Sequence, residues 1–258
     1  MTKLSVNINK IALLRNSRAG DLPSPRRFAR IALDSGAHGI TIHPRPDERH
    51  IRARDVDDLA AVLEEDRYRH AGVEFNIEGN PFLGDYVPHI EQVRPDQCTL
   101  VPDDPRQATS DHGWDIADNL DRLKPMVARL QNTGARVSLF MDPEPEQIKR
   151  VTDTGADRIE LYTESYAKAF AEGGDALKRV YDRFHAAAAV AHEVGLGINA
   201  GHDLNLYNLA AFVTIPHIEE VSIGHALIAD ALEMGLHATV KAYLAALAAT
   251  ALPPEPSS

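Results

Sequence analysis

The sequence predicts a single-domain (β/α)₈ barrel, the α/β architecture also known as the TIM barrel, for residues 1–251. Its 258 residues, 44% of them hydrophobic, are enough for one large core, and barrels of this length commonly form one domain. A recurring unit supports the same fold: a helical pattern ends near a glycine, and a short apolar strand follows almost at once. A glycine after a helix supplies the left-handed cap, so this unit is typical of a parallel sheet covered by helices. It occurs in DSGAHGITIH (34–43), NTGARVSLF (132–140), DTGADRIELY (153–162) and EVGLGINA (193–200).

Strands and helices alternate along the whole predicted domain. Further apolar strands bring the predicted number to eight, at 3–8, 72–77, 97–101 and 219–224. Helical patterns lie between them, at 24–36, 55–66, 81–94, 116–133, 144–154, 174–194, 205–213 and 226–234, with a last helix at 236–250. This alternation favours a closed barrel. A doubly wound open sheet is the alternative, but no GxGxxG or GxxxxGKS/T loop follows the first strand. The tail LPPEPSS, residues 252–258, is expected to be disordered.

Composition excludes several classes of partner. The formal net charge is −11, whereas broad binding to nucleic acid or to an anionic membrane relies on a basic surface. A phosphorylated small molecule remains compatible, provided that basic groups are concentrated locally. The single cysteine, Cys98, excludes an intrachain disulfide and a thiol metal site, and its apolar surroundings predict an inert buried thiol. The apolar runs are too short to span a bilayer and no export signal is evident, so we expect a cytoplasmic protein.

Polar residues lie near the carboxyl ends of six predicted strands. Strands that are buried on both faces should be almost continuously apolar, whereas a barrel active site needs polar groups at these ends. Alternatively, some of these residues pair with one another inside the barrel. They are Asn7, His43, Asn76, Glu160, Asn199 and Ser222. The loops that leave strands are also long and polar, which indicates a functional face; they are 10–24, 44–55, 102–115 and 163–174.

Two kinds of segment are suited to binding phosphate. The segment HPRPDERHIR (43–52) concentrates His43, Arg45, Arg49, His50 and Arg52, and the planar arginine fork suits a phosphate group. The alternative is a solvated loop in which neighbouring acids serve as ion-pair partners. NAGHD (199–203) and SIGHA (222–226) each place a glycine and a histidine directly after a strand. In barrels the loops after strands seven and eight often form a phosphate site at a helix start, although helix capping and tight turns would explain the same pattern.

Two carboxylates are candidates for proton transfer. Glu78 and Glu160 lie in predicted strands, where a buried carboxylate needs a partner or a raised pKa. Together with His43 or His202, Glu78 would make an acid–base set. Glu74 competes with Glu78, but its place in the strand favours a structural role. No HExxH motif is present, although scattered His, Glu and Asp residues could still assemble a metal site.

Several motifs in the same order match one known family over residues 4–248. They are VNINKIALLRNSR, GITIHPRPDERHI, NIEG, LVPDDPRQATSDHGWD, VSLFMD, IELYTESYA, GINAGHDL and SIGHALI. Through them the chain resembles the pyridoxine 5′-phosphate synthases. The resemblance implies a (β/α)₈ barrel with extra helices, usually assembled as a homo-octamer, a tetramer of dimers. It implies condensation of 1-deoxy-D-xylulose 5-phosphate with 3-amino-2-oxopropyl phosphate to pyridoxine 5′-phosphate, phosphate and water, with no metal or organic cofactor.

The resemblance also implies roles for individual residues. His43 and Glu78 correspond to proton acceptors, His202 to the proton donor, and Glu160 to the carboxylate that stabilises the transition state. Two further groups correspond to substrate-binding positions. Those for the amino-ketone phosphate are Asn7, Arg18, Gly224 and His225, and those for the deoxyxylulose phosphate are Arg45, His50 and Thr109. The loop that carries Thr109 is the expected lid.

The chain departs from the family pattern at three substrate-site positions. Many family members carry Asp-His where this chain has Asn9 and Lys10, both of which retain polar groups able to meet a substrate. Asp203 stands where a glycine is frequent, so we expect its side chain to point away from phosphate or to pair with a base. Two other functions remain open from the residues alone. One is a metal-assisted phosphosugar isomerase or epimerase on the same fold, and the other is a barrel that binds phosphorylated metabolites without turnover.

Overall fold

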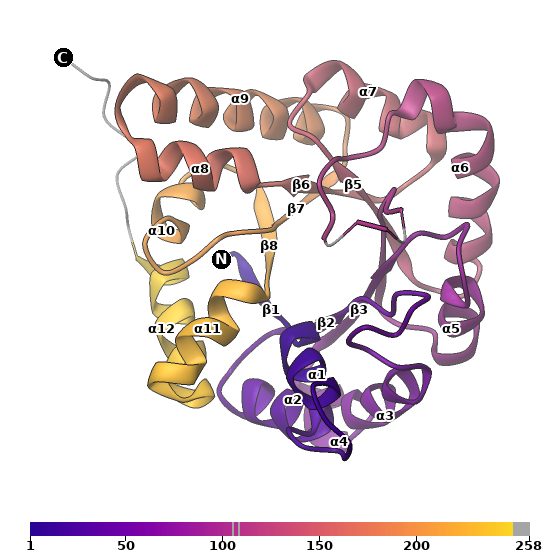
Figure 1. Ribbon diagram of the computed structural model, residues 1–258. Helices are drawn as coiled ribbons and strands as arrows, with labels where there is room; N and C mark the ends of the chain where they lie inside the picture. Colours follow the sequence, from indigo (N-terminus) through magenta and orange to yellow (C-terminus); the bar gives the residue numbers. More distant parts are fainter. Residues whose placement is uncertain (105, 108, 250–258) are drawn as a thin grey trace.

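A closed barrel of parallel strands forms the centre of the molecule (Figure 1). The computed structural model describes residues 1–104, 106–107 and 109–249. Within these residues each of the eight strands pairs in parallel with the next, and the last pairs with the first. This closure confirms the predicted (β/α)₈ barrel and excludes the open sheet. The strands are β1 (Lys3–Asn7), β2 (Gly39–Ile42), β3 (Glu74–Gly79), β4 (Gln97–Leu100), β5 (Arg136–Met141), β6 (Arg158–Tyr162), β7 (Gly197–Gly201) and β8 (Ile218–Ile223).

Helices surround the barrel (Figure 1). The first glycine of each of the four predicted units adopts a positive φ, and Gly155 directly caps a helix, as the sequence predicts. In chain order the helices are α1 (Asn9–Asn16), α2 (Pro25–Asp34), α3 (Ala53–Leu63), α4 (Asp66–Ala71), α5 (Tyr86–Val93), α6 (Ile116–Gln131), α7 (Pro145–Thr154), α8 (Glu164–Glu172), α9 (Gly174–Glu193), α10 (Leu209–Phe212), α11 (His225–Met234) and α12 (Leu236–Ala248). None of the helices in the described part of the chain is long and apolar enough to cross a membrane. The predicted tail, 252–258, and the last residue of the helix predicted at 236–250 lie outside the described residues.

The prediction of loops at 10–24 and 163–174 is wrong in part, because these segments contain α1 and α8. Both helices are polar in composition but bury residues at helical spacing. In α8, Tyr166 and Ala169 are buried, and the Tyr166 hydroxyl donates a hydrogen bond of 3.0 Å to the carbonyl oxygen of Asn208. The Tyr166 ring also packs edge-on against Phe212, at 4.9 Å between centroids. Tertiary packing, which a local pattern does not reveal, therefore makes these two segments helical.

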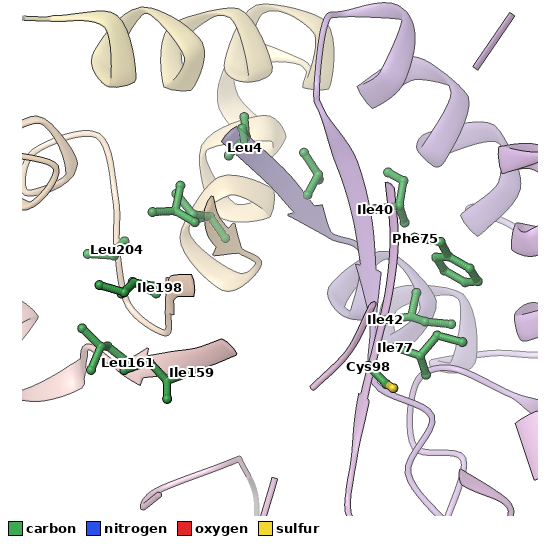
Figure 2. Close-up of a cluster of buried hydrophobic side chains, with 14 of the residues drawn as sticks. Leu4, Ile40, Ile42, Phe75, Ile77, Cys98, Ile159, Leu161, Ile198 and Leu204 are labelled. Carbon is green, nitrogen blue, oxygen red and sulfur yellow. The ribbon is translucent and has the colours of Figure 1, made fainter. Parts of the chain in front are cut away.

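The strands carry two distinct sets of side chains. One set is apolar and packs in the hydrophobic core, as Figure 2 shows for Leu4, Ile40, Ile77 and Ile159. Cys98 is part of this core and fully buried, and burial raises its pKa to about 12, which confirms the predicted inert thiol. The other set is polar and lies at alternating strand positions; its buried members include Ser5, Thr41, Asn76, Thr99, Glu160, Asn199 and Ser222. Alternation thus places apolar residues in the core and polar residues inside the barrel.

Candidate active site

A cavity of about 520 Å³ contains most of the predicted site residues. It lies at the carboxyl ends of the strands, where barrel enzymes carry their active sites. All the predicted site residues line it except Arg18, which lies exposed after α1. The members are Asn7, Asn9, Lys10, His43, Arg45, His50, Glu78, Thr109, Glu160, His202, Asp203, Gly224 and His225. The sequence motifs, far apart along the chain, therefore converge on one site.

A second cavity, of about 440 Å³, is lined by residues from the amino-terminal ends of strands. Glu74 belongs to this end, where it forms ion pairs with Lys3, at 2.6 Å, and with Arg136. The expected structural role of Glu74 agrees with these contacts, and the carboxyl-end cavity is the candidate active site.

The polar residues at the strand ends divide into two groups. Asn76 accepts a hydrogen bond of 3.1 Å from Thr99 Oγ1, and Asn199 accepts one of 3.1 Å from Arg158 Nη1. For these two residues the alternative of pairing inside the barrel is correct. The other four members of the predicted set line the cavity; they are Asn7, His43, Glu160 and Ser222.

His43 lies between two carboxylates. Its Nδ1 is 3.9 Å from Glu78 Oε2, and its Nε2 is 3.6 Å from Asp103 Oδ2. Its backbone N–H donates a hydrogen bond of 2.9 Å to Asn9 Oδ1, which fixes the end of β2. Burial, followed by the positive charge of Arg45, holds the pKa of His43 well below its usual value. His43 is therefore a neutral imidazole at neutral pH, able to accept a proton.

The two predicted carboxylates interact electrostatically; Glu160 is buried, and the side chain of Glu78 is 14% exposed. Burial, followed by the negative charge of Glu160, raises the pKa of Glu78 well above its usual value. Burial and then the charge of Glu220 raise the pKa of Glu160 to about 8. Asn7 Nδ2 donates to Glu78 Oε2 at 3.4 Å, and Thr99 Oγ1, whose proton is donated to Asn76, lies 3.4 Å from Glu160 Oε2. The raised pKa values favour the protonated form of both carboxyl groups in the ligand-free cavity, and perturbed carboxyl groups of this kind are typical of sites of proton transfer.

The predicted basic cluster is largely buried rather than solvated. Arg45 Nη2 donates to Asp103 Oδ2, and both side chains are almost inaccessible. Arg49 pairs with Asp47, at 2.7 Å, and donates to the carbonyl oxygen of Gln107 at 2.7 Å. Arg49 therefore agrees in part with the alternative of a solvated loop, because it is partly exposed and paired with a neighbouring acid. Arg45 does not agree with it, because its side chain is buried.

His50 completes this side of the cavity. Burial, followed by the charges of Arg45 and Lys10, lowers its pKa to about 3, so the ring is neutral. Its Nδ1 accepts a hydrogen bond of 2.9 Å from the backbone N–H of Ile51, which assigns the ring proton to Nε2. A neutral Nε2–H donor beside two arginines suits an anion.

Arg15 and Asp55 form a buried ion pair next to the backbone of His50. Sequence reasoning did not predict a role for either residue. Arg15, only 2% exposed, donates to both carboxylate oxygens of Asp55, at 2.5 and 2.8 Å. Its Nη2 also donates to the carbonyl oxygen of His50 at 2.9 Å. The pair therefore holds the loop after β2 against α1 and α3.

The ends of β7 and β8 are shaped by two glycines. A Cβ on Gly201 would meet Glu160 Oε1 at 2.4 Å, so only a glycine lets this carboxylate lie against β7. A Cβ on Gly224 would meet Asn7 at 3.2 Å. Gly224 is the N-cap of α11 and provides no side-chain cap, so the backbone N–H groups of the first turn remain available where Gly224 lines the cavity.

Several residues at or beside the cavity were missed by sequence reasoning. The most important is Asp103, which lies beside the cavity and contacts both His43 and Arg45; the signal for it was its place in the polar loop 102–115. The missed residues that line the cavity are Leu13, Thr99, Val101, Ser110, Phe140 and Glu164. In the described part of the chain no three His, Cys, Asp or Glu side chains are grouped to hold a metal ion.

Comparisons with known proteins agree on one family. The family model described as "Pyridoxal phosphate biosynthesis protein PdxJ" matches residues 4–249. A pyridoxine 5'-phosphate synthase of Albidiferax ferrireducens is 52% identical over 252 residues, which cover 96% of this chain and 98% of the relative. One from Porphyromonas gingivalis is 51% identical over 244 residues, which cover 94% of this chain and 98% of the relative.

Solved structures show the fold alone. Thiamine phosphate pyrophosphorylase from Pyrococcus furiosus superimposes with a TM-score of 0.60 at 14% identity, covering 95% of each chain. Tryptophan synthase from M. tuberculosis, in its aminoacrylate-bound form, gives a TM-score of 0.60 at 14% identity, covering 95% of this chain and 93% of that one.

Proposed function

Because the chain belongs to the PdxJ family of pyridoxal phosphate biosynthesis proteins, we propose that it acts as a pyridoxine 5′-phosphate synthase. It condenses 1-deoxy-D-xylulose 5-phosphate with 3-amino-2-oxopropyl phosphate, releasing phosphate and water. One observation carries this proposal: His43, Glu78, Glu160 and His202 line a single cavity that also contains basic groups and a helix N-terminus. Family membership favours this synthase over the isomerase and the non-catalytic sensor.

The two ends of the cavity suit two phosphorylated substrates. Arg45, His50 and Thr109 come from the loops after β2 and β4, and we assign them to the deoxyxylulose phosphate. Gly224 and His225 open α11, and with Asn7 they suit the phosphate of the amino ketone. Arg18, Asn9 and Lys10 complete the proposed substrate-binding set, and Asp203 lines the cavity beside it.

The acid–base groups between these ends suit the proton transfers of the reaction. The substrate amine attacks the ketone carbonyl, and loss of water gives an imine. The later elimination of phosphate and the ring closure each need a proton removed from carbon and a proton given to a leaving oxygen. Neutral His43 is placed to accept a proton, as is Glu78 once it is ionised, and His202 is placed to donate one.

The raised pKa values fit a cationic intermediate. Burial and neighbouring negative charge raise the pKa of both Glu78 and Glu160 in the ligand-free cavity. A positive charge that develops on the imine nitrogen would favour their ionised forms. Glu160 would then stabilise that charge, and Glu78 would become a base only when substrate is bound.

The direct test is product formation. Purified protein is mixed with both substrates, and pyridoxine 5′-phosphate is measured by mass spectrometry together with released phosphate. We expect both products in equal amounts, and neither when one substrate is left out. A folded protein that makes no product from authentic substrates contradicts the proposal.

We also propose a domain extent, an assembly and a location. Residues 1–251 act as one catalytic domain. The protein forms a homo-octamer, in support of which Leu13, Leu14, Leu232 and Met234 are exposed on the neighbouring helices α1 and α11. A cytoplasmic location suits phosphate-ester substrates, which do not cross membranes unaided. Light scattering of the purified protein tests the octamer, and cell fractionation tests the location.

A further inference from the structure

The chain turns sharply after β7, at the two residues that follow Gly201. His202 has φ +86° and Asp203 has φ +61°, both in the left-handed region that non-glycine residues rarely occupy. The backbone here is held by Asn208 Nδ2, which donates to the carbonyl oxygen of Asp203 at 3.2 Å. This hydrogen bond is accepted by the backbone of Asp203, so it does not involve the Asp203 carboxylate.

The carboxylate of Asp203 lies against the imidazole of His202. Asp203 Oδ2 is 3.0 Å from His202 Nδ1, and Thr109 Oγ1 is 3.1 Å from His202 Nε2 on the other side of the ring. The Nδ1 atom is buried and makes no well-aligned hydrogen bond among the described residues, so its contact with Asp203 becomes an ion pair when the ring carries a second proton. The ring of Tyr162 packs edge-on at 5.0 Å between centroids.

Other charged groups are near this pair. Glu164 on α8 interacts electrostatically with His202. Its carboxylate already forms an ion pair with Lys168, with 2.7 Å between Oε1 and Nζ. His225 on α11 and Lys168 both act on Asp203 electrostatically. The pKa of Asp203 is lowered, mainly by its contact with His202, so the carboxylate is ionised at neutral pH. Asp203 thus places a negative charge in direct contact with the ring, whereas the carboxylate of Glu164 is paired with Lys168.

We propose that Asp203 is a positioning residue for His202: its carboxylate orients the ring and favours the protonated form from which His202 donates a proton. An adjacent negative charge favours a cationic imidazolium, and the contact at Nδ1 leaves the Nε2–H as the group that is donated. In the ligand-free protein Thr109 Oγ1 lies 3.1 Å from Nε2, at the position where a proton acceptor would bind. The inference rests on the proposed function, because it explains how His202 serves as the donor.

The experiment compares Asp203→Asn and Asp203→Gly with the unchanged protein. Asparagine keeps the size of the side chain, glycine suits the backbone, and both residues tolerate a positive φ, so both variants should fold. The first readout is the NMR titration of the His202 ring, which needs no substrate. We expect its midpoint to fall by about one pH unit in each variant.

The second readout is the pH dependence of kcat for product formation. Since the protonated ring is the active form, loss of the carboxylate should move the basic limb to lower pH. Turnover at pH 8 should then fall by about tenfold, with KM for both substrates changed less than about twofold. Glu164→Gln is the matched control and should shift the ring titration by a clearly smaller amount.

The outcomes separate the two proposals. An unchanged His202 titration in both Asp203 variants, or an equal shift in Glu164→Gln, overturns the role of Asp203 whatever the activity. A shifted titration in a protein that makes no pyridoxine 5′-phosphate supports the His202–Asp203 pair and contradicts only the proposed function.

Discussion

Arg45 and Asp103 form a buried ion pair that joins the loop after β2 to the loop after β4. Their side chains are 5% and 6% exposed, and Ser110 Oγ donates a further hydrogen bond of 3.0 Å to Asp103 Oδ2. Burial raises the pKa of Asp103 while Arg45 lowers it, and the net direction is upward. Removing one partner of a buried pair leaves the other uncompensated, which costs about 3–5 kcal/mol.

We therefore expect Asp103→Ala to destabilise the protein by about 3 kcal/mol. The double variant with Arg45→Met should be less destabilised than the sum of the two single variants, because it leaves no lone buried charge. Urea unfolding of all four proteins measures this coupling. If the two changes add within about 0.5 kcal/mol, the pair is not a stabilising unit.

Glu78→Gln should lower turnover and leave folding intact. Because burial and Glu160 raise the pKa of Glu78, the native carboxyl group carries a proton at neutral pH, and glutamine resembles that form. Loss of a general acid or base typically costs about 10²–10⁴-fold in rate. Steady-state kinetics and thermal unfolding check the two parts. Unchanged kinetics would remove Glu78 from the mechanism.

Gly201→Ala should reduce kcat by displacing Glu160. The added Cβ would meet Glu160 Oε1 at 2.4 Å, and a displacement of about 1 Å in an active site can cost about 100-fold in rate. Gly155→Ala is the matched control: it has φ +81° but open space around the new Cβ, so it should cost about 1 kcal/mol of stability and leave kcat unchanged. A Gly201→Ala enzyme with normal kcat would contradict the placement of Glu160.

The free energy of unfolding should decrease from about pH 5 to pH 8. Burial raises the pKa of Glu160 to about 8 and that of Glu220 to about 7, against 4.5 as the usual value. The folded state then binds more protons than the unfolded state between these values, so stability falls as pH rises through this window. The slope is about 1 kcal/mol per pH unit for each group.

Glu220→Gln tests this pH dependence at a residue outside the proposed acid–base set. It should flatten the slope between pH 5 and pH 7, both directly and by removing a charge that raises the pKa of Glu160, and make the protein more stable than its parent at pH 8. Urea unfolding at several pH values measures the slope, and Glu233→Gln, at an exposed position on α11, is the control. An identical slope in Glu220→Gln and the parent protein would contradict the assignment of the titration to Glu220.

The barrel and most of its site were predictable because they depend on local patterns. Helix–glycine–strand units locate the strands, and a polar residue at a strand end, such as His43 or Glu160, faces the same edge of the sheet as its neighbours. What failed depends on contacts between distant residues. Arg15 looks like a surface base within a polar loop, yet it is buried because its partner Asp55 lies 40 residues further along the chain.

The same reason explains two other differences. Asn76 and Asn199 have the same strand-end signal as Asn7, but their partners Thr99 and Arg158 on neighbouring strands decide that they pair within the barrel. Asp103 gave no specific signal, because its importance comes only from the approach of two loops. Register and loop packing, not composition, separate these roles.

The ion pair of Arg45 and Asp103 has a consequence for how an anion enters. Asp103 is a tethered competitor for the guanidinium, present at a high effective concentration because the fold fixes it there. An anion that binds the guanidinium of Arg45, as we propose for a phosphate ester, would compete with this carboxylate, and a doubly charged phosphate ester would do so more effectively than a singly charged acid. Arg49 and Arg45 also donate hydrogen bonds to the carbonyl oxygen of Gln107, which lies in the loop after β4. Replacing Asp103 by an anion would therefore weaken the contacts that join the loop after β2 to the loop after β4. Selectivity for the ligand and movement of the loop after β4 are thus thermodynamically linked.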